Sequence, residues 1–380
     1  MVGFSGVSLI DDTRAHSRHC ERSAAIHEPL PRCARNDDAH VVTMHESFNK
    51  IVAMHHLCRA LFFITSSALC TLASAEVSLP AAPWPNKPLK IMVGFPAGTS
   101  PDLVARTLAE PLAKALGQPV VVENRPGAGG NIAADLVAKA TDHHTIGVMI
   151  NGNLTIAKLV NPKTPFDPAK DLAPISLIGT APLVLAAPTA APGTTAQEFL
   201  TAARMAGSTW SYGSPGVGTV GHIGMELLKS RTGITAVHVP YPGYPQVVTA
   251  MIGGQIQLSM LPPGLALTQA RAGKVKAIGV TSAGRSTLAP DIPSLNEAGV
   301  RDFQLEIWNG VAGPASLPKP VIERLSRLIS EIARSDEVRQ KLFQQGWQVA
   351  GTGAEGLAKR MQLDYGVLGR VIAQQGIKAE

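Results

Sequence analysis

The chain has 380 residues, of which 45% are hydrophobic and only 16% are charged, so it is long enough to fold into two domains. Its formal net charge is +6, but no run of Lys or Arg concentrates that charge. This pattern argues against a nucleic-acid-binding protein and is compatible with anionic ligands. All four cysteines lie before residue 76, so the remainder offers no disulfide, thiolate nucleophile or cysteine metal site.

The first 87 residues are expected to precede the folded protein. Residues 54–75 combine a weakly basic start, an apolar stretch too short to cross a bilayer and the small residues Ala73 and Ala75, which is typical of a secretory signal peptide cut after Ala75. Residues 1–53 are interpreted as an upstream extension that is not native, with the true start at Met44 or Met54. Residues 76–87 are rich in Pro and Ala and are predicted to form a linker.

After this linker, short apolar runs alternate with amphipathic helical patterns. The sequence predicts strands over residues 89–95, 120–123 and 145–150, and helices over residues 101–116 and 131–140. Because these strands are continuously apolar, we expect a parallel sheet that is covered by helices on both faces.

A second set of elements begins near residue 183. Strands are predicted over residues 183–187, 209–212, 236–239, 256–260 and 275–280, and a helix over residues 220–229. The pattern changes again near residues 306–310, and two further helices are predicted over residues 321–333 and 355–374. The fold class is therefore α/β with two lobes. Lobe 1 is expected to comprise residues 84–186 and 307–380, and lobe 2 residues 187–306.

Three strand-to-helix junctions have the residues of an anion site, and we name them loop one (residues 95–102), loop two (residues 125–131) and loop three (residues 214–222). In loop one Ser100 is expected to cap the helix, and in loop three Thr219 has that role. A helix start offers unpaired N–H groups and a partial positive charge to a carboxylate. Ligands of open α/β sheets gather at the carboxyl ends of the strands, so loops one and three are expected to hold one anion from opposite sides. Ordinary helix capping remains the alternative, and the glycines of loop two could serve only a tight turn.

Two enzyme classes were weighed against this interpretation. Gly216, Gly218 and Gly221 match the G-x-G-x-x-G pattern, but the acidic residue that holds the ribose of a nicotinamide cofactor is missing about 20 positions later. Ser214 lies near His222, yet the sequence around it is not the G-x-S-x-G elbow of hydrolases. A nicotinamide-dependent enzyme and a hydrolase are therefore the alternatives from another functional class.

No cofactor and no metal site is expected. No P-loop pattern occurs, and the adjacent His143 and His144 lack the spacing that places two metal ligands on one helix face. His222 is expected to cap a helix or to bond a ligand, whereas His238 is expected to be a core residue. Tyr241 follows an apolar strand in a stiff turn, where it either lines a cleft or lies on the surface.

Several stretches resemble the substrate-binding proteins of tripartite tricarboxylate transporters, also known as the Bug family. The most specific stretch is GQPVVVENRPGAGGN at residues 117–131, and YGSPGVGT at residues 212–219 is another. Shorter matches follow in the same order at residues 239–241, 253–255 and 293–299, and the similarity extends from about residue 84 to residue 378. The chain departs from the family in loop one, where the usual Gly-Gly-Ser-Thr-Asp is Gly-Thr-Ser-Pro-Asp at residues 98–102.

The resemblance implies a periplasmic binding-protein fold of type II that closes on its solute. It implies a monomer that delivers a small carboxylate to integral membrane transporter subunits and has no catalytic residues. The family's solutes are typically di- or tricarboxylates, acidic amino acids or aromatic acids, held between loop one and loop three by backbone groups and bridging water. A receptor that reports to a sensor kinase is a further alternative.

The expected ligand contacts lie on loops one and three and at the ends of neighbouring strands. Backbone amides are expected to bind the carboxylate, and side chains near Asn151, Tyr241 and Trp308 the other end of the ligand, although Trp308 is equally a candidate for packing at the hinge. The full set of predicted ligand-binding residues is Ala97, Gly98, Thr99, Ser100, Asp102, Asn151, Ser214, Gly216, Val217, Gly218, Thr219, His222 and Tyr241.

Overall fold

The computed structural model describes residues 84–287 and 289–378, which belong to one compact unit that begins at residue 80. The predicted upstream extension, the signal peptide and most of the linker lie outside the described residues. Within the described part, no helix has the length and apolar character needed to span a bilayer.

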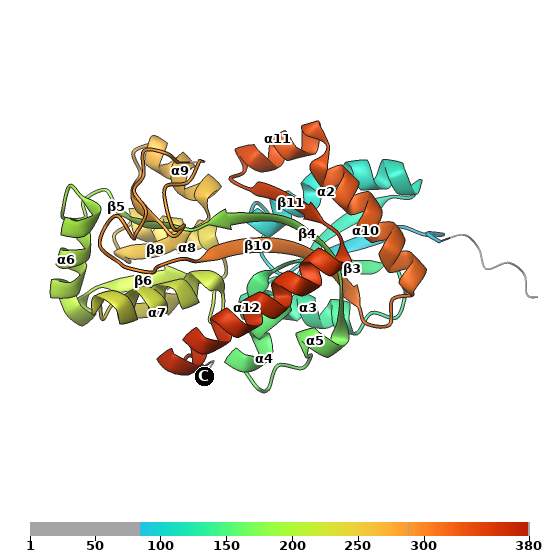
Figure 1. Cartoon of the computed structure of the whole chain (residues 1–380), viewed down its shortest axis with the longest axis horizontal. Coiled ribbons are helices and arrows are strands. Elements are labelled where there is room, and N and C mark those ends of the chain that lie inside the picture. The colour runs from blue at the N-terminus through green and yellow to red at the C-terminus, as the bar shows by residue number, and fades with distance from the viewer. Residues whose placement is uncertain (1–83, 288, 379–380) are drawn as a thin grey trace, which may run out of the picture. The chain divides into compact units, whose positions relative to one another are not determined.

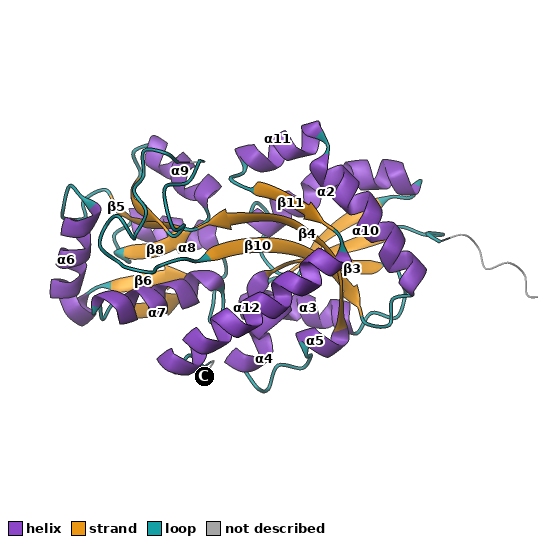
Figure 2. Cartoon of the chain, viewed as in Figure 1, coloured by secondary structure: helices purple, strands orange, loops and turns teal. Residues whose placement is uncertain are grey.

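Two sheets form the framework, and Figures 1 and 2 show helices on both sides of them. The first has six strands in the order β11-β4-β10-β3-β1-β2, and the second has five in the order β7-β6-β8-β5-β9. We define lobe 1 as residues 84–182 and 306–378, which carry the first sheet, and lobe 2 as residues 184–305, which carry the second. The change of sheet falls between Pro182 and Val184. The predicted lobe boundaries at residues 186 and 306 stay predictions.

The first pass through lobe 1 contains β1 (Leu89–Val93), α2 (Ser100–Leu116), β2 (Val120–Asn124), the 3₁₀ turn η1 (Ala128–Gly130), α3 (Asn131–Ala138), β3 (Thr145–Ile150), the π-turn η2 (Gly152–Ile156), α4 (Ala157–Val160), α5 (Pro168–Asp171) and β4 (Leu172–Pro182). Lobe 2 contains β5 (Val184–Pro188), α6 (Ala196–Ala206), the 3₁₀ turn η3 (Gly207–Thr209), β6 (Ser211–Ser214), α7 (Val220–Thr232), β7 (Val237–Pro240), α8 (Tyr244–Ile252), β8 (Leu258–Leu261), α9 (Pro263–Arg271) and β9 (Val275–Val280). The chain then returns to lobe 1 with β10 (Glu306–Pro314), α10 (Lys319–Arg334), α11 (Asp336–Gln344), β11 (Gln348–Thr352) and α12 (Ala354–Gln375).

The sheets are mixed, which corrects the prediction of a parallel sheet. β1 pairs in parallel with β2 and β3, but β10 runs antiparallel to β3 and to β4. In lobe 2, β6 pairs in parallel with β7 and β8, whereas β5 is antiparallel to β8 and β9. The antiparallel strands arise because β4 leads into lobe 2 and β10 returns beside it, so the two strands must run in opposite directions (Figure 1).

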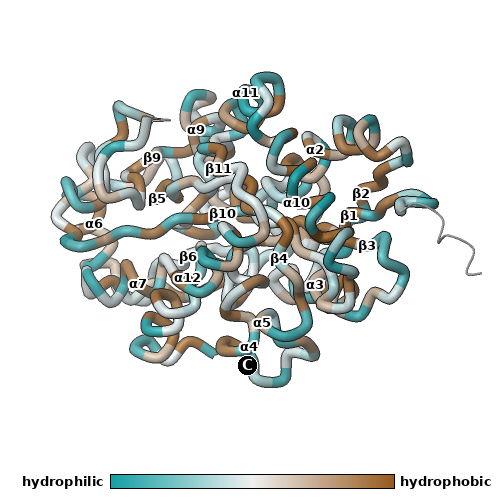
Figure 3. Tube along the Cα trace, turned by 45° about the vertical axis from the view of Figure 1, so that its right-hand side comes forward, coloured by the Kyte–Doolittle hydropathy of each residue, from teal (hydrophilic) through white to brown (hydrophobic). Residues whose placement is uncertain are grey.

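Side-chain alternation along each strand separates two layers of core. In β1, Ile91 and Val93 pack into the cluster that contains α2 and α10, while Met92 packs into the cluster that contains α3. Apolar strands between two helical layers therefore behave as the sequence predicts, with nearly every β1 side chain buried. Hydrophilic residues fall mainly on the loops and outer helical turns, which are teal in Figure 3.

Candidate functional site

Loops one and three have nearly the same backbone structure. Thr99 and Thr219 precede α2 and α7 with extended backbone angles, φ −77° and ψ 161° against φ −71° and ψ 154°. Each hydroxyl donates a hydrogen bond to the carbonyl three residues earlier, on Pro96 at 2.6 Å and on Gly216 at 2.8 Å. Neither side chain therefore caps its helix, and the N–H groups of both first turns stay available to a ligand.

This arrangement corrects the expectation that Ser100 caps α2, because Ser100 is already the first residue of that helix. The first α-helical hydrogen bonds run from Leu103 N to Thr99 O at 2.9 Å and from Ile223 N to Thr219 O at 3.0 Å. The N–H of Ser100 and those of Val220 and Gly221 precede these bonds, so α-helix geometry provides no partner for them.

Both helix starts line one small cavity, which we call the tryptophan pocket. Its volume is about 40 Å³, and it lies between the lobes, with Thr99, Ser100 and Trp308 on one side and Thr219 and Gly221 on the other. The positive ends of α2 and α7 thus border one space, as expected for an anion site. The two tryptophans for which we name the pocket, Trp308 and Trp347, belong to lobe 1.

The remaining wall of the tryptophan pocket is apolar with a few neutral polar groups. Asn151, Asn309 and Trp347 are buried in this wall, and Tyr244 enters it from lobe 2. Burial raises the pKa of the Tyr244 hydroxyl, which therefore stays protonated. No Asp, Glu, Lys, Arg or His lines the pocket among residues 84–287 and 289–378, so any charge there would be balanced by neutral dipoles.

Asp102 lies behind loop one rather than inside the pocket. It is 1% exposed, and its carboxylate accepts hydrogen bonds from Gly98 N at 2.8 Å, Arg106 Nε at 3.0 Å and Asn124 Nδ2 at 2.9 Å. Burial alone would raise the pKa of Asp102, but these hydrogen bonds and the Arg106 charge outweigh it and hold the pKa below its usual value. All of these partners belong to the protein, so the structure places Asp102 as a brace of loop one instead of a ligand contact.

His222 occupies the matching position behind loop three. Its Nδ1 accepts a hydrogen bond from Gly218 N at 3.3 Å, just as Asp102 accepts one from Gly98 N. The ring lies 4.2 Å from the ring of His238, measured between centroids. Burial lowers the pKa of each histidine to about 4, so both rings are neutral at physiological pH.

Ser214 pairs with His238 instead of His222, which bears on the hydrolase alternative. The Ser214 Oγ lies 2.7 Å from His238 Nε2 and donates to Gly216 O at 3.1 Å. Ser214 is fully buried, and its hydroxyl contacts Gly216 of loop three and His238. The pair therefore holds the loop: His238 has a partner, as predicted, but it is only half-buried rather than a core residue.

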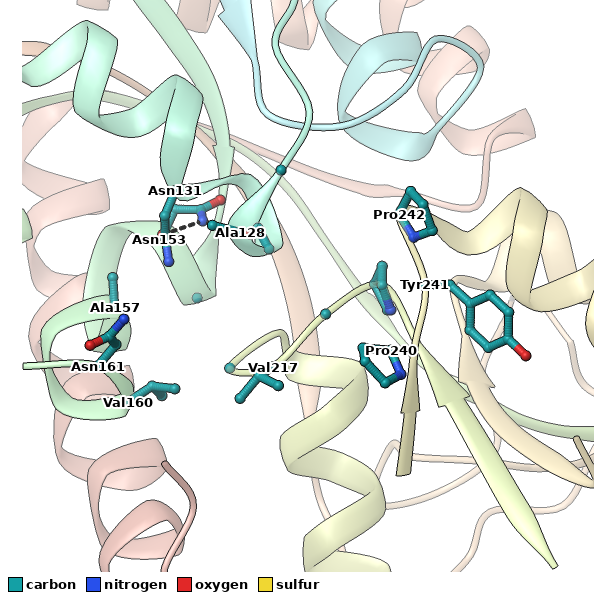
Figure 4. A pocket seen from close by; sticks show the side chains of 16 residues that line it. Ala128, Asn131, Asn153, Ala157, Val160, Asn161, Val217, Pro240, Tyr241 and Pro242 are labelled. Carbon is teal, nitrogen blue, oxygen red and sulfur yellow. Dashed lines mark hydrogen bonds between the residues drawn. The ribbon is translucent and has the colours of Figure 1, made fainter. Parts of the chain in front are cut away.

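A second and larger cavity, which we call the glycine pocket, lies on the other side of loop three. It has a volume of about 440 Å³ and is lined by loop two, by η2 and α4, and by residues 215–218 and 240–242. Figure 4 shows Asn153 and Asn131 hydrogen-bonded on one wall and Val217 on the other. The ring of Tyr241 points away from the wall that carries Asn131 and Asn153 in this view.

The lobes contact one another where loop three meets η2. A Cβ built on Gly152 would lie 2.8 Å from the carbonyl oxygen of Gly218. Any larger residue at position 152 would therefore push loop three away, so glycine allows the close approach of the lobes at this point.

The predicted site residues thus fall into five groups. Thr99, Ser100, Asn151 and Thr219 line the tryptophan pocket together with Trp308. Gly216, Val217, Gly218 and Tyr241 line the glycine pocket, and Gly98 lines a third cavity with Tyr244 and α9. Asp102, Ser214 and His222 are buried behind the loops. Ala97 lines none of these three cavities and is exposed.

Three polar side chains of the tryptophan pocket were not among the predicted site residues. Tyr244 was overlooked in favour of Tyr241, although both follow the same strand. Asn309 and Trp347 come from β10 and from the residue before β11. Their places depend on strand pairing over more than 100 residues, for which a single sequence carries no local signal.

Comparisons with known proteins agree with this geometry. The model of the tripartite tricarboxylate transporter family receptor matches residues 104–377. A Pseudomonas sp. (strain P51) protein, described as the UPF0065 protein in the tcbD-tcbE intergenic region, is 34% identical over 72% of this chain and 82% of its own length.

Two solved structures are similar as well. R. palustris Rpa4515 with adipate has a TM-score of 0.75 and 28% identity, covering 78% of this chain and 99% of that one. MatC (Rpa3494) from Rhodopseudomonas palustris with bound malate has a TM-score of 0.72 and 30% identity, covering 76% of this chain and 100% of that one. The predicted fold class is thereby confirmed, and the chain belongs to the family of tripartite tricarboxylate transporter receptors.

Proposed function

We propose that the chain binds the carboxylate of a small acid in the tryptophan pocket, between the first turns of α2 and α7. One observation carries this proposal: two loops with matching hydrogen bonds present their helix starts to the same cavity. Helix N-termini with unpaired N–H groups stabilise anions through direct hydrogen bonds and through the helix dipole. The available donors are the N–H groups of Ser100, Val220 and Gly221.

Similar proteins support the chemical class of the ligand. The solved neighbours contain adipate and malate, and both are small carboxylates. Among the described residues, Tyr244 is the one ionisable group that lines the pocket, so the ligand's negative charge would be met by backbone dipoles and bridging water rather than by an ion pair. Such a site recognises a carboxylate by geometry and needs no cationic side chain.

The wider role follows from the family and from the start of the chain. We propose export to the periplasm with cleavage after Ala75, and delivery of the solute by a monomer to the integral membrane subunits of a tripartite transporter. The signal-peptide pattern of residues 54–75 supports the export step. N-terminal sequencing of the exported protein tests the cleavage site, and the mature sequence should begin at Glu76.

A thermal-denaturation screen tests the ligand class. The probes are butyrate, succinate, adipate, malate and citrate, with glucose as a neutral control. A ligand at 100 times its Kd stabilises the native state by about 2.7 kcal/mol, which is a clear shift in melting temperature. Stabilisation by glucose without any response to the acids would reject the carboxylate assignment.

The variant Val220→Pro tests the position of the carboxylate. Val220 is the first residue of α7, where proline fits the helix and removes only the N–H that faces the pocket. A lost hydrogen bond to a charged group costs about 1.5–3 kcal/mol, so affinity for the strongest acid of the screen should fall about 10- to 100-fold. Ala196→Pro makes the same change at the first residue of α6, away from the pocket, and should leave affinity unchanged. Equal affinities of the two variants would place the carboxylate elsewhere.

A further inference from the structure

Three buried side chains of the tryptophan pocket have polar atoms without a hydrogen-bond partner among the described residues. They are both amide atoms of Asn309, the Oδ1 of Asn151 and the Nε1 of Trp347. Their residues are 1%, 0% and 3% exposed, respectively. Buried polar groups are nearly always hydrogen-bonded, so such a cluster around one cavity indicates an occupant.

The orientation of Asn151 is fixed by the protein. Its Nδ2 donates to Glu306 O at 3.1 Å and lies 3.4 Å from Asp364 Oδ2, so the amide nitrogen faces these acceptors. The Oδ1 is therefore directed away from them and has no donor among the described residues, and it can only accept a hydrogen bond.

The two pocket tryptophans differ in whether the indole N–H has a hydrogen-bond partner. The Trp308 Nε1 donates to Asp364 Oδ2 at 2.6 Å and is satisfied within the protein. The Trp347 Nε1 has no such partner among the described residues, although the backbone N–H of Trp347 is held by Leu342 O at 2.9 Å. Trp347 thus adds an unpaired donor to the residues that line the pocket, whereas the Trp308 donor is already used.

The cluster consists of one acceptor on Asn151, one donor on Trp347 and an amide on Asn309 that can do both. A second carboxylate would be a poor match, since it only accepts hydrogen bonds and would meet the Asn151 oxygen in a pocket that no described Lys or Arg lines. A hydroxyl or a carboxamide both donates and accepts, and it carries no charge. The volume of about 40 Å³ also has room for about three water molecules, which makes water the competing occupant.

We infer that Asn151, Asn309 and Trp347 select ligands that carry, besides the carboxylate, an uncharged group that donates and accepts hydrogen bonds. The preferred solutes are then small hydroxy acids or monoamides of dicarboxylic acids, rather than dicarboxylates. This inference rests on the proposed function, because it assumes that the carboxylate occupies the helix starts of the same pocket.

Calorimetric titration with four acids of equal chain length tests the inference. The probes are butyrate, 4-hydroxybutyrate, succinamate and succinate. Tighter binding of 4-hydroxybutyrate or succinamate, by at least about tenfold over both other acids, is expected from one added hydrogen bond to buried partners. Equal affinity for all four acids would overturn the inference while the proposed function stands, and would assign the polar cluster to water. Tighter binding of succinate would also overturn it. Binding of none of them would remove the support for both.

Two variants locate the effect. Asn309→Leu replaces the amide with an apolar side chain of similar size, and Trp347→Phe removes the indole donor. Each should abolish the preference for the uncharged polar group, so that 4-hydroxybutyrate and succinamate bind within about threefold of butyrate when all three are measured on the same variant. Trp308→Phe is the matched control, because its N–H serves Asp364, and it should retain the preference. A preference that survives both Asn309→Leu and Trp347→Phe would contradict the assignment.

Discussion

Loop one and loop three share a backbone but differ in the group that supports it. The residue three positions after the N-cap threonine accepts a hydrogen bond from the preceding glycine in both, and it is Asp102 in one loop and His222 in the other. The carboxylate of Asp102 is satisfied by Arg106 and Asn124 as well, while the imidazole of His222 stacks on other rings of lobe 2. The same loop backbone is therefore supported by the Asp102 carboxylate in lobe 1 and by the neutral, titratable imidazole of His222 in lobe 2.

The largest expected effect comes from truncating the charged brace. Asp102→Ala removes a buried carboxylate that accepts hydrogen bonds from Gly98, Arg106 and Asn124, and we expect a loss of about 3 kcal/mol in the free energy of unfolding. His222→Ala removes only the acceptor of Gly218 and should cost about 1–2 kcal/mol. Urea denaturation measures both values, and an equal loss in the two variants would contradict the proposed difference between the braces.

Lowering the pH toward 4 should weaken the support that His222 gives to loop three and leave the support of loop one by Asp102 intact. The folded pKa of His222 and of His238 is about 4, below the ordinary 6.5, so the unfolded chain takes up protons first as pH falls. The contribution of each neutral histidine to the free energy of unfolding is thus fully present above pH 6.5. It declines between pH 6.5 and about 4, by on the order of 3 kcal/mol for one histidine. The groups that face the rings are Tyr212, Glu226 and Lys229, and the opposing charges of Glu226 and Lys229 act in opposite directions.

His222→Asn sharpens this test, since an amide oxygen can replace Nδ1 as the acceptor of Gly218 N–H without titrating. We expect its stability to depend less on pH over this range than that of the wild type. The exposed His143 of lobe 1 provides the control, and His143→Asn should keep the full dependence. Denaturation curves at pH 7, 5.5 and 4.5 give the comparison, and identical pH profiles for all three proteins would assign the acid sensitivity to other groups.

The smallest effects should come from the two matching glycines. Gly98 and Gly218 both have φ of +79°, so alanine at either position costs about 1 kcal/mol of backbone strain. A Cβ on Gly98 meets nothing within 4 Å, but on Gly218 it lies 3.0 Å from Val160 of the other lobe. Gly218→Ala should therefore also weaken binding of the strongest acid severalfold, whereas Gly98→Ala should lower the melting temperature alone. A ligand titration that gave equal affinities would show that the lobes do not approach more closely on binding.

Much of the fold could be predicted from the sequence because apolar strands and amphipathic helices carry a local pattern. β3 matches its predicted range at residues 145–150, and the predicted range of α7 begins at the observed residue. β4 was missed because Pro174, Ser176 and Gly179 interrupt its apolar character, and pairing with β10 and β11 defines it instead. α6 was also missed, although Thr195 and Glu198 form a capping box that the sequence displays.

The candidate site was predictable only where a short stretch determines it. Loops one and three were found through glycine and capping residues within eight or nine positions. The role of Asp102 was mistaken, since its partner Asn124 arrives from β2 and leaves no free oxygen for a ligand. Asn309 and Trp347 require the register of a six-stranded sheet, which is set by packing over the whole lobe.

The C-terminal helix α12 connects parts of both lobes. Asp364 and Arg360 of α12 bond Trp308 and Glu306 at the start of β10, while Gln375 Nε2 donates to Ser230 Oγ of α7 at 3.1 Å. Substitutions along this helix are therefore expected to change how the two lobes are held together, and with it the solute affinity, while every pocket residue stays the same.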